Sequence, residues 1–305
     1  MTGDGDAGPP AVRFDDITVR FGDEPVLRRL RGEFPAGELT VLMGESGGGK
    51  TTLMRHLVGL RKPDSGSIEV GGRVVHTLDK RGLTALRGSM GVLLGGATLF
   101  DSSVFGSLTV YENVAYPLRL RVDDDETVHA TVCRWLGTLG LADAHDRLPE
   151  QLPAHTRRRV ALARALAPEP PLIVLDDIDL GLDSTTVARA VAAVRDVHAR
   201  RGSTVVVTTH DIELARALGG RLAVLAHGRL VANGPVAELL DGVRDAADFD
   251  DRFRVRDSLG PMDIPAPPAG RRWTVAVDPR LVAILVAGLV LVTALVIAVR
   301  LSGAG

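Results

Sequence analysis

The chain has 305 residues, which is enough to bury one large core or two smaller ones. Its formal net charge is -2, so bulk charge gives no indication of nucleic-acid binding. Its single cysteine, Cys133, excludes an internal disulfide and fits a reducing compartment.

Residues 1–10 are small, acidic and interrupted by proline and glycine, and they lack the basic and apolar parts of a signal peptide. We expect a disordered leader there. Across residues 11–240, strand-like and helix-like segments alternate, which predicts an α/β domain with a largely parallel sheet. The expected strands include 39–43, 172–176, 204–208 and 221–226, and the expected helices include 128–139, 157–166 and 185–198.

A phosphate-binding loop is the strongest motif. Residues 44–51 match the pattern G-x-x-x-x-G-K-[ST], with an apolar run before them and a helical run after them. Glycines let backbone N–H groups wrap phosphates, Lys50 would neutralise the β- and γ-phosphates of ATP, and the Thr51 hydroxyl would ligate Mg²⁺. The alternative is a glycine-rich turn with a chance lysine. The predicted nucleotide-binding residues of this loop are Gly44, Glu45, Ser46, Gly47, Gly48, Gly49, Lys50, Thr51 and Thr52.

Two later strands end in residues that suit the same chemistry. The apolar run 172–175 is followed by Asp176, which we expect beside the loop as a second Mg²⁺ ligand. The next strand ends at 208–211, where His210 is placed to contact the γ-phosphate or to organise the attacking water. The alternatives are an aspartate that caps a strand and a histidine in a solvated loop.

The order of these elements resembles the ATPase domain of ABC transporters over residues 11–240. Phe21 stands where that family stacks adenine, 159–166 is similar to the stretch after the family's signature, and 181–183 resembles the loop used across the dimer. The resemblance implies a P-loop ABC ATPase fold with a helical subdomain, and ATP and Mg²⁺ as cofactors. Segments 97–100 and 108–119 resemble the subgroup that serves Mce/Mla-type lipid transporters, although 102–106 then looks like an insertion.

The family's signature aligns with residues 152–156, and here the sequence departs from the pattern. In the family, a serine hydroxyl and glycine N–H groups contact the γ-phosphate held by the other subunit. Pro153 has neither a hydroxyl nor an N–H, and Ala154 and His155 add side chains where the backbone must approach closely.

Two further departures affect hydrolysis. Gly95 stands where the family has a glutamine that contacts Mg²⁺ and water, and Asp177 stands where it has the catalytic glutamate. The aspartate keeps a carboxylate on a side chain one methylene shorter, while a general base must come within about 2.6–3.2 Å of the water. We therefore expect Asp177 and His210 to be the catalytic residues of a slow ATPase.

The remaining sequence predicts a membrane anchor. Residues 241–280 are expected to be an acidic and then Pro/Gly-rich linker, followed by a 281–299 segment in which only Thr293 is polar. About 20 apolar residues span a bilayer, and the arginine excess before this segment places its N-terminal side in the cytoplasm. The alternative is a buried core helix, and 300–305 would be a short tail.

These features predict the ATP-binding subunit of an ABC transporter of the lipid-transport type, with single-pass attachment to a bacterial cell membrane and a cytoplasmic ATPase domain. Its expected partners are permease subunits, a second nucleotide-binding subunit of the same or another chain, and the membrane, with no nucleic acid. The alternative is a membrane-tethered, catalytically impaired ATP-binding regulator or scaffold.

Overall fold

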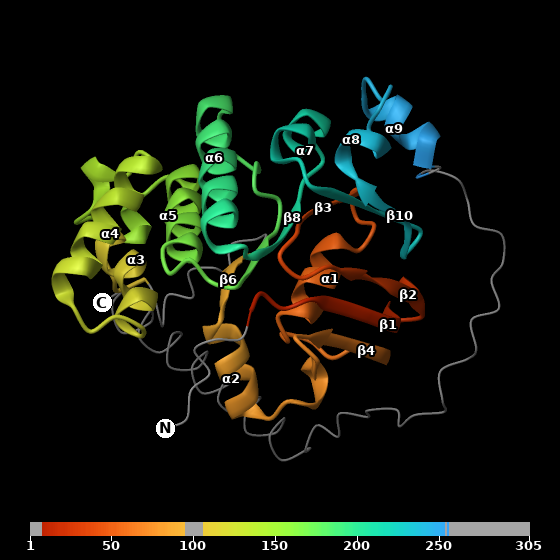
Figure 1. The fold of residues 1–305 in the computed structure, drawn as a ribbon, viewed down its shortest axis with the longest axis horizontal. Helices are drawn as coiled ribbons and strands as arrows, with labels where there is room; N and C mark the ends of the chain where they lie inside the picture. The colour runs from red at the N-terminus through yellow and green to blue at the C-terminus, as the bar shows by residue number, and fades with distance from the viewer. Residues whose placement is uncertain (1–7, 95–105, 254, 256–305) are drawn as a thin grey trace, which may run out of the picture. The chain divides into compact units, whose positions relative to one another are not determined.

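The computed structural model describes residues 8–94, 106–253 and 255 (Figure 1). Within these residues, a six-stranded sheet has the order β10-β9-β3-β8-β7-β6, and a four-stranded sheet has the order β2-β1-β4-β5. The larger sheet consists of β3 (Leu39–Gly44), β6 (Met90–Leu93), β7 (Leu172–Leu175), β8 (Thr204–Thr208), β9 (Arg221–Ala226) and β10 (Arg229–Pro235).

The centre of the larger sheet is parallel, as the sequence predicts. Strand β3 pairs in parallel with β8 and β9, and β7 pairs in parallel with β6 and β8, while β10 is antiparallel to β9. Every residue of β3, β7 and β8 is buried, which explains their apolar runs. Parallel strands end at one edge of a sheet, so Gly44, Asp176 and Thr209 emerge close to one another.

The smaller sheet is antiparallel throughout. Phe21 is the last residue of its first strand, so this aromatic side chain lies at the end of a strand inside the sheet. The strands of this sheet are β1 (Val12–Phe21), β2 (Glu24–Phe34), β4 (Ser65–Val70) and β5 (Arg73–Val74).

Polar caps set the starts of several helices. Asp183 accepts a hydrogen bond from the Thr186 N–H at the start of α6, and Asp211 does the same for α7. Thr109 and Glu112 form a reciprocal capping box at the start of α3. The helices are α1 (Lys50–Leu57), α2 (Lys80–Gly88), α3 (Val110–Arg119), α4 (Asp125–Thr138), α5 (Ala154–Leu166), α6 (Ser184–Arg201), α7 (Ile212–Leu218), α8 (Val236–Leu239) and α9 (Ala246–Phe253).

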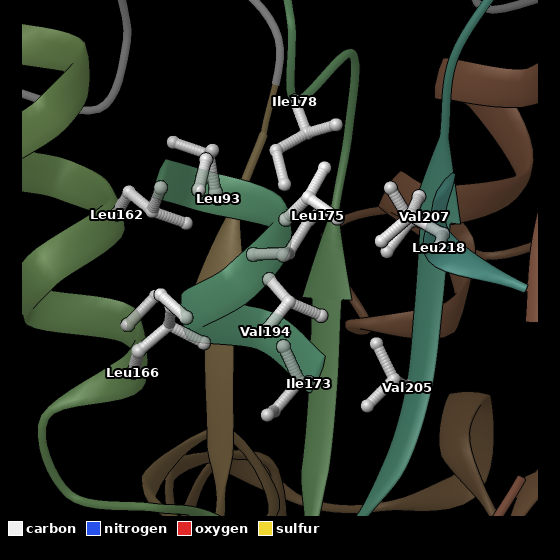
Figure 2. Close-up of a cluster of buried hydrophobic side chains, with 14 of the residues drawn as sticks. Leu93, Leu162, Leu166, Ile173, Leu175, Ile178, Val194, Val205, Val207 and Leu218 are labelled. Carbon is white, nitrogen blue, oxygen red and sulfur yellow. The ribbon is translucent and has the colours of Figure 1, made fainter. Parts of the chain in front are cut away.

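Two hydrophobic clusters cover the two faces of the larger sheet. Successive residues of β3 alternate between them, with Val41 and Met43 in one cluster and Leu42 in the other. Figure 2 shows the first cluster, in which α5 and α6 cover the strands. Each fully buried Leu, Ile or Val contributes about 1.5–3 kcal/mol relative to exposure. The labelled side chains are Leu93, Leu162, Leu166, Ile173, Leu175, Ile178, Val194, Val205, Val207 and Leu218.

Helices α3, α4 and α5 pack together as a helical layer, on the side away from the smaller sheet (Figure 1). Helix α5 also lies directly on β6. A Cβ atom at Gly91 would come within 2.1 Å of the Ala165 carbonyl oxygen, so the strand and the helix touch backbone to backbone. Only glycine permits this close approach.

The region expected to be an acidic linker begins differently from that expectation. Residues 246–253 form α9, in which Phe249 is buried and its ring lies 4.8 Å from that of Phe253. Asp245 accepts hydrogen bonds from the first N–H groups of this helix, and Val243 and Val255 are buried in the core. The charged residues of 246–253 therefore belong to an amphipathic helix that packs Phe249 into the core, and this part of the region is not an extended connector.

Among the described residues, no helix has the length and apolarity needed to cross a membrane. The expected membrane segment 281–299 lies outside the described residues, as do the Pro/Gly-rich part of the expected linker, the tail 300–305, residues 1–7 of the expected leader, the segment 97–100 and Gly95.

Candidate nucleotide-binding site

The phosphate loop joins β3 to α1 and depends on its glycines. Gly44 has a φ of 148°, and a Cβ there would lie 2.0 Å from the Leu225 carbonyl oxygen. Gly49 has a φ of 101° and caps α1, and a Cβ there would meet the Leu27 side chain at 2.9 Å. The loop can therefore wrap closely, and the first N–H groups of α1 face what it surrounds.

Lys50 is held inside this loop. Its side chain donates from Nζ to the carbonyl oxygens of Gly44, at 2.9 Å, and of Glu45, at 3.0 Å. Burial lowers the pKa of Lys50, and the nearby carboxylates of Asp177, Asp176 and Glu45 oppose that shift. Both hydrogen-bond acceptors of the Lys50 ammonium group are neutral carbonyl oxygens. Bound phosphates would give it anionic acceptors.

A cavity of about 180 Å³ lies over the loop. It brings six of the predicted loop residues together with both predicted catalytic residues, which come from the ends of β7 and β8. Gly44, Glu45, Gly48, Phe21 and Asp176 are not among its lining. The lining residues are Ser46, Gly47, Gly49, Lys50, Thr51, Thr52, Asp177 and His210.

Asp176 is fully buried, at 0% exposure, and does not line the cavity. Its Oδ1 accepts a hydrogen bond of 2.8 Å from the Thr208 hydroxyl, and its N–H donates to the Leu93 carbonyl at 2.7 Å. The same Thr208 oxygen accepts a hydrogen bond of 2.7 Å from the N–H of Asp177. One hydroxyl therefore links the two successive acidic residues.

The two predicted catalytic groups shift each other's charge state. Burial and the adjacent Asp176 raise the pKa of Asp177, while His210 and Lys50 oppose that shift. Burial and the Lys50 charge lower the pKa of His210, against the attraction of nearby aspartates. The histidine is therefore held neutral at neutral pH, and the aspartate is a stronger base than an exposed one.

Phe21 lies at the end of β1 with 49% of its surface exposed. The guanidinium carbon of Arg61 lies 5.6 Å from its ring centroid, within the range of a cation–π contact. The exposed ring remains suitable for stacking a base.

The segment aligned with the family signature opens α5. Pro153 is the N-cap residue of that helix and provides no side-chain cap. Pro153, Ala154 and His155 are exposed, while Leu152 and Thr156 are buried and anchor the segment.

Two residues at the site were not predicted. The position of Thr208 follows from strand pairing: Leu175 pairs with Val207, so the next residues, Asp176 and Thr208, lie side by side. Arg158 donates hydrogen bonds to the backbone carbonyls of Asp176 and Asp177. Nothing in the arginine run 157–159 distinguishes it, since only the packing of α5 selects which arginine reaches the strand end.

The donors near the loop fit Mg²⁺. Thr51 supplies a hydroxyl and Asp176 a carboxylate, and Mg²⁺ prefers oxygen ligands completed by water and substrate phosphates. Among the described residues, no group of three or more His, Cys, Asp or Glu side chains could hold a metal by protein ligands alone. The arrangement suits a metal that arrives with its nucleotide.

Comparisons with known proteins agree on one family. The family profile described as ABC transporter matches residues 27–179. The methionine import ATP-binding protein MetN of Mesorhizobium japonicum is 34% identical over 231 residues, covering 76% of this chain and 62% of the relative. The probable ribonucleotide transport ATP-binding protein mkl of Mycobacterium leprae is 32% identical, covering 75% and 65%. This chain thus spans less than two thirds of the length of these relatives.

Solved structures show the same fold with substantial identity. The dimeric structure of MJ0796, a bacterial ABC transporter cassette, has a TM-score of 0.66 and 29% identity, covering 74% of this chain and 98% of that one. The post-hydrolysis state of the same cassette, bound to ADP and Pi, has a TM-score of 0.65 and 29% identity, with the same coverage. The chain therefore belongs to the ABC transporter family and carries the ATP-binding, ATPase-type domain of that family.

Proposed function

We propose that this chain is the ATP-binding subunit of an ABC transporter and that it binds MgATP and hydrolyses it slowly. One observation carries the proposal: the phosphate-loop cavity unites Lys50 and Thr51 with Asp177 and His210. The family assignment supports it, as does the likeness to a cassette whose structure contains ADP and Pi.

The residues have separate roles in nucleotide binding. The loop N–H groups and Lys50 bind the phosphates, and the exposed face of Phe21 stacks the adenine. Thr51 and Asp176 would hold Mg²⁺, which neutralises charge on the β- and γ-phosphates when bound. The buried hydrogen bond from Thr208 keeps the Asp176 carboxylate oriented for that task.

Hydrolysis depends on the two groups at the strand ends. Asp177 accepts the proton of the attacking water, and neutral His210 orients the water or contacts the γ-phosphate. The aspartate reaches one methylene less far than a glutamate, and a misplacement of about 1 Å can cost about 10²-fold in rate. Gly95, which supplies no side chain to water or metal, lowers the rate further.

The signature segment indicates the kind of partner. Pro153 offers no N–H to a phosphate, and Ala154 and His155 crowd the backbone. A homodimer would carry this segment at both sites, so we propose pairing with a more intact nucleotide-binding subunit. The other proposed partners are permease subunits, and nucleic acid is not among them. We propose that residues 281–299 anchor the chain in a bacterial cell membrane, with the ATPase domain in the cytoplasm.

The transported substrate is proposed to be a lipid, on the likeness of 108–119 to the Mce/Mla subgroup. That segment includes helix α3, in which Tyr116 is exposed, and Leu120, which follows the helix, is exposed too. The similar proteins named above are described as methionine import and ribonucleotide transport proteins. A second function, a catalytically impaired ATP-binding regulator or scaffold, is favoured specifically by the loss of the signature N–H at Pro153.

Paired measurements of MgATP binding and phosphate release on the full-length protein test the proposal. We expect tight binding and slow release for the wild type, loss of both in Lys50→Ala, and faster release in Asp177→Glu, because the longer side chain restores reach. Tight binding without any release, unchanged in Asp177→Glu, would favour the regulator. Absence of binding would exclude both functions.

A further inference from the structure

The backbone at Asp177 adopts an unfavourable conformation. This residue follows β7 with a φ of 49°, in the left-handed region. Residues with a Cβ rarely occupy that region, although aspartate tolerates it better than most. Such a conformation persists only where surrounding contacts hold it.

Two side chains from different elements provide those contacts. Thr208, at the end of β8, accepts a hydrogen bond of 2.7 Å from the Asp177 N–H. Arg158, on α5, donates from one Nη2 to the Asp176 carbonyl at 2.8 Å and also to the Asp177 carbonyl. The two residues therefore hold the peptide groups on both sides of the Asp177 Cα atom.

The Thr208 hydroxyl has only one proton to donate. Its nearest carboxylate acceptor is Asp176 Oδ1 at 2.8 Å, whereas Asp177 Oδ1 lies at 3.4 Å. The proton therefore goes to Asp176. Asp177 keeps its carboxylate lone pairs for the cavity that it shares with Lys50 and His210.

The short side chain makes this anchoring important. An aspartate carboxylate is fixed by two side-chain torsions, while a glutamate has three and can compensate for a shifted backbone. The position of the Asp177 carboxylate thus follows its backbone closely. A displacement of about 1 Å at a catalytic group can lower the rate about 10²-fold.

We propose that Arg158 and Thr208 are positioning residues that set the Asp177 carboxylate against the attacking water. They act through the Asp177 backbone, and neither of them lines the phosphate-loop cavity. This inference rests on the proposed ATP hydrolysis. Helix α5, which begins at the altered signature segment, would then also hold the catalytic residue of its own chain through Arg158.

Steady-state phosphate release by the full-length protein tests the roles of both residues. We expect Arg158→Gln to lower kcat by about tenfold or more, with the KM for ATP changed much less. Thr208→Val should lower kcat to a similar extent and also raise the KM for MgATP, because its hydroxyl orients Asp176 as well. Arg158→Lys, which keeps a charge and one donor group, should fall between Arg158→Gln and the wild type. Thr208→Ser, which keeps the hydroxyl, should retain most of the activity.

Arg159→Gln is the matched control. Arg159 lies on the same helix and its Nη1 also bonds two carbonyls, those of Leu139 at 3.1 Å and Gly140 at 3.0 Å. It makes no hydrogen bond to residues 176–178. We expect this variant to keep a kcat close to that of the wild type.

Backbone exchange separates positioning from general damage. Amide hydrogens of residues 176–178 should exchange faster in Arg158→Gln and not in Arg159→Gln. If wild type releases phosphate while Arg158→Gln matches it in kcat and exchange, the inference is wrong and the proposed function stands. If wild type releases none, the proposed hydrolysis fails and the exchange alone decides whether Arg158 holds this backbone.

Discussion

At the scale of single residues, the environment that makes Asp177 a stronger base also lowers the stability of the folded domain at neutral pH. Burial and the neighbouring Asp176 raise its pKa. A carboxyl group whose pKa is higher in the folded than in the unfolded chain binds its proton more tightly when folded. The stability of the nucleotide-free domain therefore decreases as pH rises from about 4 through that raised pKa, and the loss persists at neutral pH.

Asp177→Asn removes this charge and should raise the Tm of the nucleotide-free protein at neutral pH, while lowering phosphate release. The gain in Tm should disappear at acidic pH, where the wild-type carboxyl is protonated. Thermal unfolding at several pH values measures both effects. Asp123→Asn, at an exposed position, serves as the control and should leave the Tm unchanged. A lower Tm for Asp177→Asn at neutral pH would contradict the argument.

The residues that could be predicted are those fixed by local spacing. Lys50 and Thr51 follow from the loop pattern, and Asp177 and His210 follow from strand ends that meet at one sheet edge; the cavity unites these four. Arg158 could not be predicted, because its role depends on how α5 packs on the sheet. Local sequence defines which residue follows a strand, but it does not define which side chain of another helix reaches it.

At the scale of elements, the same distinction holds. The expected strands 204–208 and 221–226 coincide with β8 and β9, because each has a run of consecutive apolar residues, as buried parallel strands do. The expected helix 128–139 begins earlier in the structure, at Asp125, since Asp124 caps it. Helix α9 was missed because its charged residues outnumber the single buried Phe249 in an eight-residue stretch.

Helix α9 provides an element-scale prediction. Phe249→Ala should lower the free energy of unfolding by about 3 kcal/mol, the low end for a buried phenylalanine, because the helix lies at the margin of the core. Denaturant unfolding of the full-length protein measures this loss. Phe253→Ala, which truncates a partly buried ring, should cost less. Equal stability of Phe249→Ala and wild type would mean that α9 contributes nothing to the fold.

At the scale of the whole molecule, the prediction concerns pairing. Restoring the family pattern with Pro153→Ser, Ala154→Gly and His155→Gly returns a hydroxyl and one backbone N–H to the start of α5 and removes the side chains beside two other N–H groups. Losing one donor to developing charge typically costs on the order of 10²-fold, so we expect phosphate release by the protein alone to rise at least tenfold. The rise should depend on protein concentration, as a reaction between two copies requires.

Adding Lys50→Ala to the restored protein is the control and should abolish release, because the nucleotide is lost. Light scattering in MgATP would show whether the restored protein self-associates more strongly than wild type. A restored segment that changes neither release nor association would argue against any role of this surface in a paired site.

The backbone contact between Gly91 and Ala165 holds one point of α5 against the sheet. If α5 rotates as a rigid body, this contact is the pivot of the rotation. Near its C-terminal end the helix rests backbone to backbone on β6, while its N-terminal end at 153–155 is exposed. At 1.5 Å per residue, that exposed end lies about 18 Å from the pivot and Arg158 about 10 Å from it. A partner that tilts the exposed end would thus carry the Arg158 backbone a little more than half as far. Docking at the exposed end of α5 would then shift the Asp177 carboxylate of the same chain through Arg158, by rotation of the helix and without any change in the strands.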